Sequence, residues 1–233
     1  MKLRPWLRFS GLAAVWGGVL GAAVSLLASA AYYNHDWSRG EAPAWTRAFI
    51  RLLGDAFSYA SAQEVYHTYG RAFLPALLLI LLGVLGLQAC CLLRSGKHAG
   101  WGYRLVVAGL VMGLLGNLAD YWFGPQSLGQ VASVVGFVVG TELGMLVYTA
   151  GAVMMARLLW QEGVLPAPLA ALMAFAPLLG LLLLFWGVRH IPGGFYLPVS
   201  LSWVLIGLKM WIQNARDLLR QAPGAHLQAK THD

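Results

Sequence analysis

Charged side chains are scarce in this chain. Only 11% of its 233 residues are charged, whereas 59% are hydrophobic, and soluble domains typically contain about 25% charged residues. The mean hydropathy is correspondingly high, at +0.65. This shortage of charge excludes an ordinary soluble domain and predicts an all-α integral membrane protein whose first partner is the lipid bilayer.

The sequence also lacks the short motifs of several enzyme classes. It contains no His-Glu-x-x-His, no Gly-x-Ser-x-Gly, no Walker loop and no Gly-x-Gly-x-x-Gly that opens a nucleotide fold. No apolar stretch has a histidine in its middle that could bind haem or a metal pair. We therefore assign no catalytic residue, no metal and no cofactor, and an intramembrane enzyme is only the third of our functional hypotheses.

Cysteine is nearly absent, with Cys90 and Cys91 as its two examples. Adjacent residues rarely fit disulfide geometry, and no other cysteine or histidine stands at metal-ligand spacing. We interpret both as buried apolar residues, and reversible acylation near a membrane face is the alternative.

A long basic tract is missing too, although the formal net charge is +7. Lysine and arginine stand singly, mostly near the ends of apolar stretches, so we expect no nucleic-acid partner. The following basic residues share one set of ends: Lys2, Arg4, Arg8, Arg94, Lys97, Arg104, Arg157, Lys209, Arg216 and Arg220. The short turn at 124–130, on the other side, has none. The positive-inside rule then predicts a cell-membrane protein with both termini in the cytoplasm.

Six apolar stretches are long enough to cross a bilayer as helices. They cover approximately residues 11–32, 73–93, 105–123, 131–160, 166–188 and 195–212. The first follows a basic N-terminus, as a cleaved signal peptide would, but it is longer than the usual 7–15 apolar residues, so we take it as an uncleaved span. We expect one six-helix domain over residues 1–220 and a flexible cytoplasmic tail over 221–233.

Between the first two spans, residues 43–60 have the pattern of an amphipathic helix. Trp45, Phe49 and Leu53 fall on one helical face, whereas Arg51 and Asp55 fall on the other and can pair. We expect an extracytoplasmic helix in the membrane interface, and a lid over the bundle is the alternative.

Glycines in helical rows mark the expected contacts between spans. Small residues spaced by four allow two helices to approach closely in a membrane. The glycines that we assign to helix packing are Gly17, Gly21, Gly109, Gly113, Gly116, Gly136, Gly140 and Gly144. Asn117 and Asp120 share the stripe of the third span with its glycines, so both should face protein rather than lipid.

Glu142 lies on the other side of the fourth span from its glycines, near mid-span. An ionised acid near the bilayer centre costs at least about 2.5 kcal/mol, so we expect Glu142 to turn inward and to be protonated, paired or beside water.

Several polar residues should meet at the outer end of the bundle. The candidate pocket consists of Arg71, His67, Arg189, His190 and Asp120, with Asn117 one turn deeper and Glu142 deeper still. In the alternative interpretation the arginines extend to the interface, Asp120 neutralises one of them and the histidines are ordinary loop residues.

Two functional hypotheses follow. The first is a non-enzymatic subunit or scaffold of a membrane assembly, whose glycine rows pack against its own helices, against partner membrane subunits or within a homo-oligomer. The second is a transporter or binding subunit for a small molecule or an ion, which uses the outward-facing pocket at Asn117, Asp120 and Glu142.

Overall fold

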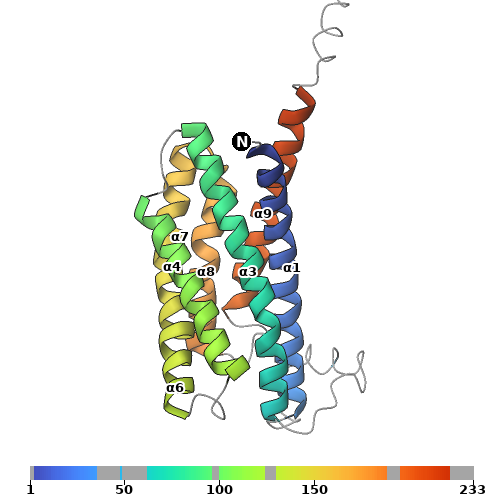
Figure 1. Cartoon of the computed structure of the whole chain (residues 1–233), viewed down its shortest axis with the longest axis vertical. Helices are drawn as coiled ribbons and strands as arrows, with labels where there is room; N and C mark the ends of the chain where they lie inside the picture. The colour runs from blue at the N-terminus through green and yellow to red at the C-terminus, as the bar shows by residue number, and fades with distance from the viewer. Residues whose placement is uncertain are drawn as a thin grey trace, which may run out of the picture.

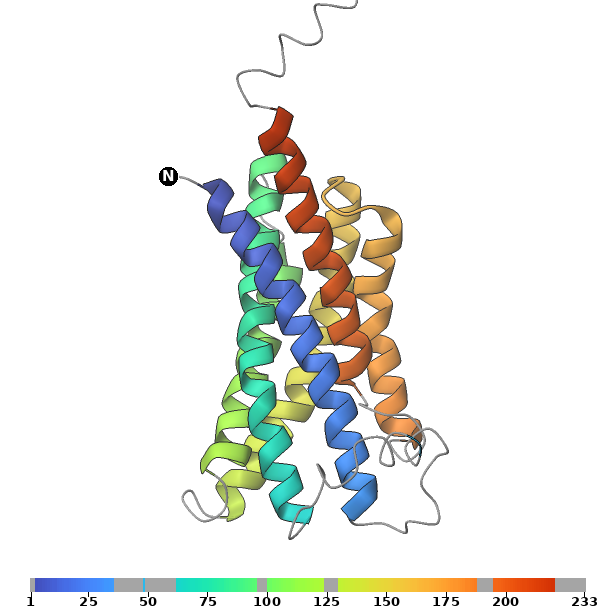
Figure 2. The ribbon, with the colours of Figure 1, turned by 90° about the vertical axis from the view of Figure 1, so that its right-hand side faces the viewer.

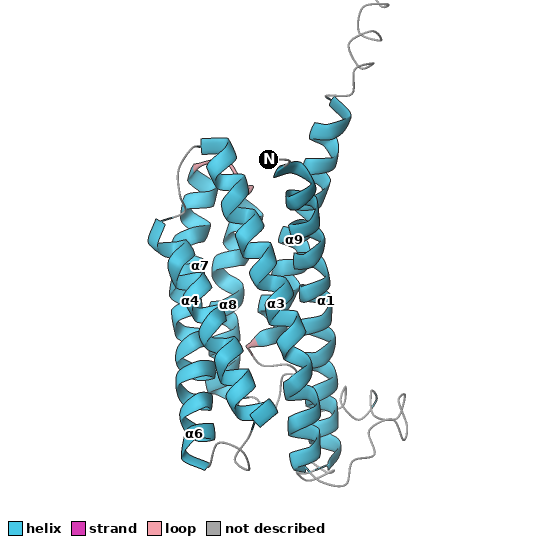
Figure 3. Cartoon of the chain, viewed as in Figure 1, coloured by secondary structure: helices cyan, strands magenta, loops and turns pink. Residues whose placement is uncertain are grey.

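The computed structural model describes residues 3–35, 48, 62–95, 100–123, 130–187 and 195–220. Nearly all of these residues are helical, and none of them is in a strand (Figure 3). The all-helical prediction is therefore confirmed. Except for Ala48, the predicted amphipathic helix at 43–60 lies outside the described residues, and so does the predicted tail at 221–233.

The described residues form six helical segments. Two of these segments include π-helical turns, in which hydrogen bonds run from i to i+5 and the helix widens. In chain order the elements are α1 (Leu3–His35), α3 (Ala62–Ser95), α4 (Gly100–Asn117) with η2 (Leu118–Phe123), α6 (Gln130–Val135) with η3 (Gly136–Leu143) and α7 (Gly144–Gln161), α8 (Ala167–Gly187) and α9 (Tyr196–Arg220).

Four of the segments are long and apolar enough to cross a membrane: Pro5–Ala28, His67–Leu93, Gly100–Phe123 and Gly136–Gln161. Helix α8 contributes a shorter apolar part, Ala167–Leu183. Each of the six predicted stretches overlaps one helical segment, and α1 and α3 begin well before the apolar runs that predicted them.

The helices pack into two groups that meet where α3 contacts α4 and where α8 contacts α9. Helix α1 packs against both α3 and α9, whereas α4 packs against α7, which in turn contacts α8 (Figure 1). The first residues of α1 and the last residues of α9 lie at the same end of the bundle, with the two helices crossing along their length (Figure 2).

Glycines hold α4 directly against η3 and α7. A Cβ atom added at Gly116 would lie 2.7 Å from the Cα of Gly140, and one at Gly109 would lie 2.7 Å from the carbonyl oxygen of Gly144. Contacts this short are possible only without side chains. Gly113 differs from its neighbours in the row, because the nearest atom to its added Cβ belongs to Leu77 and is 4.0 Å away.

The glycines of α1 are likewise used within the chain. Gly17 lies against α3, where an added Cβ would be 2.9 Å from the backbone nitrogen of Ile80. Gly18 and Gly21 lie against α9 at Ser200. The close contacts of these glycines are therefore contacts between helices of one molecule.

Apolar residues cover the outside of the bundle as well as forming its core. Large apolar side chains such as Trp16, Leu115 and Phe175 are exposed on the outside. Among the residues whose burial the structure describes, the buried polar ones are Ser10, Ser25, Gln88, Asn117, Asp120, Thr149, Ser200 and Ser202. A hydrocarbon solvent favours this arrangement, because polar groups can find hydrogen-bond partners only inside the bundle.

Candidate functional site

Asn117 joins α4 to α3 at the end of the bundle that holds η2. Its side chain is only 4% exposed, and Nδ2 donates a hydrogen bond of 2.7 Å to the carbonyl oxygen of Gly70. The other side-chain atom, Oδ1, is buried and has no hydrogen-bond partner in the described part of the chain. Asn117 therefore acts as a connector between helices and keeps one unused acceptor.

Arg71, the next residue on α3, makes a second connection. Its Nε donates a hydrogen bond of 2.8 Å to the carbonyl oxygen of Tyr121, and its guanidinium lies 5.7 Å from the centre of the Trp122 ring. The last carbonyls of a helix have no partner within that helix, so a basic side chain is a suitable donor there. The ring of Tyr121 also packs directly over Gly70.

These residues form what we call the α3–η2 polar cluster: Gly70, Arg71, Asn117, Asp120, Tyr121 and Trp122. Asp120 is 7% exposed and lies in the first turn of η2. His67, one turn before Arg71 on α3, is half-buried. Arg189 and His190 lie outside the described residues, so the full outer pocket stays a prediction.

Glu142 is not part of this cluster. The structure places it on the outer surface of η3, where Val138, Val139, Leu143 and Leu146 are exposed around it. Our expectation that this acid turns into the bundle was therefore wrong. The glycine side of η3 packs against α4, and the opposite side faces away from the other helices that the structure describes.

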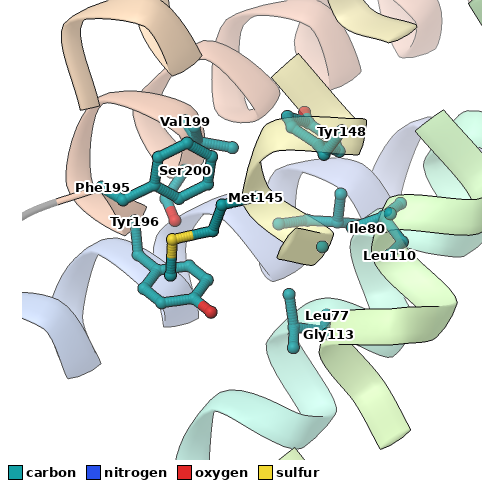
Figure 4. Close-up of a pocket in the computed structure, with 12 residues that line it drawn as sticks. Leu77, Ile80, Leu110, Gly113, Met145, Tyr148, Phe195, Tyr196, Val199 and Ser200 are labelled. Atoms are coloured by element: carbon teal, nitrogen blue, oxygen red, sulfur yellow. The ribbon is translucent and has the colours of Figure 1, made fainter. Parts of the chain in front are cut away.

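A small cavity lies between α3, α4, α7 and α9 (Figure 4). Its volume is about 30 Å³, and its walls include Leu77, Gly113, Met145, Tyr148 and Tyr196. One buried water needs about 10–15 Å³ and a cavity that admits benzene measures about 150 Å³, so this cavity has room for roughly two water molecules. None of Asn117, Asp120 and Glu142 lines it.

Aromatic side chains form the wall of the cavity toward α9. The ring centres of Phe73 and Tyr196 are 4.7 Å apart, and those of Tyr148 and Phe195 are 6.3 Å apart. Trp203 is fully buried, and its Nε1 donates a hydrogen bond of 2.7 Å to the hydroxyl of Tyr148. Sequence reasoning missed this group; the available signal was a tyrosine and a tryptophan inside long apolar runs.

The hydrogen bonds described at both sites connect one helix to another. In the polar cluster, Asn117 and Arg71 donate to backbone carbonyls, and the cavity walls carry hydroxyls but no carboxylate or imidazole. No group of three or more metal-ligating side chains occurs among the described residues. Comparisons of this chain with protein family models, with curated proteins and with solved structures find no match.

The unused acceptor of Asn117 gives a prediction about two substitutions. Asn117→Leu removes both the hydrogen bond to Gly70 and the unpartnered Oδ1, so we expect a loss of only about 0.6 kcal/mol, the average for such bonds in membranes. Asn117→Asp keeps an acceptor and sets a second oxygen against the Gly70 carbonyl, so we expect a loss of about 1–3 kcal/mol. Unfolding in mixed micelles measures both, and a larger loss for Asn117→Leu would contradict the assignment.

Proposed function

We propose that this protein is a non-enzymatic subunit or scaffold of a membrane assembly. The observation that carries the proposal is how its interior polar groups are used. Asn117 and Trp203, both buried, each donate to a group on another helix, and so does the exposed Arg71 at the end of the bundle, which stabilises the bundle. Because the central cavity has room for only about two water molecules, the interior is suited to holding a fixed shape.

The proposed topology has six membrane spans. Helices α8 and α9 hold the fifth and sixth predicted spans and are 21 and 25 residues long, which is enough to cross a bilayer. An even number of crossings agrees with the position of the start of α1 and the end of α9 at the same end of the bundle (Figure 2). The lysines and arginines at that end support its assignment to the cytoplasm of a cell-membrane protein.

The transporter hypothesis has less support. It requires a polar path that reaches Glu142 from one side, whereas Glu142 is exposed on the outer surface and does not line the cavity. We therefore keep the subunit or scaffold as the single proposed function.

Its test is the size of the particle that contains the chain in its native membrane. We expect extraction with a styrene–maleic acid copolymer, at native expression level, to give a particle with more protein than one chain of 25.2 kDa. Mass photometry measures the mass of the particle. The same chain produced alone in a foreign membrane still forms a homo-oligomer but lacks any partner subunits, so a second measurement there distinguishes the two. A particle holding one chain and no other protein would overturn the proposal.

A further inference from the structure

The outer surface of η3 and α7 carries an acid within an otherwise apolar area. We call this area the Glu142 face: Val138, Val139, Glu142, Leu143 and Leu146, all of them exposed. Scattered apolar residues on such a surface need no explanation in a lipid environment. A carboxylate does, because acids in membrane spans almost always pair or point toward water.

The depth of Glu142 follows from the packing of α4 on η3. Gly116 lies against Gly140, so Glu142 is close to the level of Leu114 on the antiparallel α4. Trp122, in the aromatic end of η2, lies eight residues further along. At 1.5 Å per residue, Glu142 lies roughly 10 Å inward of Trp122. Arg157, toward the other end of α7, is fifteen residues away, or roughly 22 Å. The acid is therefore within the hydrocarbon layer and beyond easy reach of water.

None of the described basic residues lies at the depth of Glu142. Arg71 lies at the outer end of the bundle and binds the Tyr121 carbonyl. The basic residues described elsewhere lie toward the opposite end: Arg4, Arg8, Arg94, Arg104, Arg157, Lys209, Arg216 and Arg220. The group that compensates Glu142 must therefore come from outside these helices.

We propose that the Glu142 face docks a transmembrane helix of a different protein, and that this helix carries a lysine or arginine at the depth of Glu142. Charge complementarity favours such a helix over a second copy of this chain. A two-fold contact through the same face would bring two Glu142 carboxylates together, and like charges at close range oppose each other. The inference rests on the proposed function, since it names the kind of partner that the subunit binds.

Site-specific photo-crosslinking of the full chain in its native membrane tests the face. The probe p-benzoylphenylalanine replaces Val139, and a control probe replaces Leu179 on α8; both side chains are 47% exposed. We expect adducts with another protein from position 139, with little at position 179. Mass spectrometry should map them to a membrane span within a few residues of a lysine or arginine.

Charge variants then test the role of Glu142 itself. Glu142→Gln should lower the adduct yield at position 139 roughly tenfold or more, as expected for loss of one charge-assisted hydrogen bond. Glu142→Lys should abolish the adduct, and changing the partner's basic residue to glutamate should restore it. Because Glu142 is exposed, these variants should fold, which an unchanged unfolding midpoint in micelles would verify.

Several outcomes would overturn the inference. They are adducts with lipid alone, with a second copy or with another segment of this chain, equal yields at the two probe positions, and an unchanged yield in Glu142→Gln. If any of these occurs while the extracted particle still contains more than one chain, the docking proposal for the Glu142 face is wrong and the proposed function stands. If the particle holds a single chain, both fail.

Discussion

Gly116→Ala is expected to disrupt the packing of α4 on η3 and to lower the yield of folded protein sharply. An added methyl group at Gly116 would lie 2.7 Å from the Cα of Gly140 and 2.8 Å from the carbonyl oxygen of Gly136. Both atoms belong to backbone and cannot rotate away, so the helices must separate. Overpacking costs typically about 1–3 kcal/mol, and a backbone-to-backbone clash belongs at the upper end. The measurements are the monodisperse fraction after detergent extraction and the unfolding midpoint in micelles.

Gly113→Ala is the matched control, since it makes the same chemical change one turn away on the same helix. The nearest atom to its added methyl would be 4.0 Å away, at the edge of the cavity. The loss of a helical glycine there should stabilise the chain by up to about 1 kcal/mol. Equal effects of the two substitutions would show that this contact does not hold the two helices together.

Trp203→Ala is expected to be the most damaging change in α9. The side chain is 0% exposed, and its ring lies 3.5 Å from where a methyl at Gly83 of α3 would be. Its removal leaves a large hole and takes the hydrogen-bond donor from the Tyr148 hydroxyl. Truncation of a buried tryptophan costs about 3–5 kcal/mol. We expect a much lower unfolding midpoint in micelles than for the unaltered chain.

Trp211→Ala controls for the loss of a tryptophan from the same helix. Trp211 lies eight residues further along α9 and is 37% exposed. Its truncation should change the unfolding midpoint by well under half the effect of Trp203→Ala. A comparable loss at both positions would contradict the assignment of Trp203 as a central packing residue.

Much of the fold could be predicted because hydrocarbon restricts what an apolar chain can form. Long apolar stretches must become helices to satisfy their backbone hydrogen bonds, and the six stretches do coincide with helical segments. The spacing of Asn117 and Asp120 relative to the third-span glycines put them on one side of one helix, and both are buried. The periodicity of a single helix is sufficient to predict that these two residues are buried.

The placement of Glu142 required information that one helix does not contain. Its spacing correctly puts Glu142 on a different side of the helix from Gly140 and Gly144. Spacing does not tell whether that second side is also covered by a helix, because this depends on where the other helices lie. The energetic cost of a lipid-facing acid favours burial within the chain. That cost applies equally to a surface that another protein covers.

The contacts around Tyr148 and Arg71 could not be predicted for a related reason. Tyr148 meets Trp203 from a helix more than fifty residues away, and Arg71 meets the backbone of Tyr121 at a π-helical turn. At Gly113 the spacing predicts a close contact that the structure lacks, since this glycine belongs to the row but has no close neighbour. Such pairings depend on how whole helices are offset along one another.

The packing of α1 on α9 has a consequence for biosynthesis. Gly18 on α1 rests on Ser200 and Val204 of α9, which is made much later during translation. At about 5–20 residues per second, the ribosome needs roughly ten seconds or more to make the chain between them. During that interval this surface of α1 stays uncovered, and the bundle can close only after the ribosome has made α9.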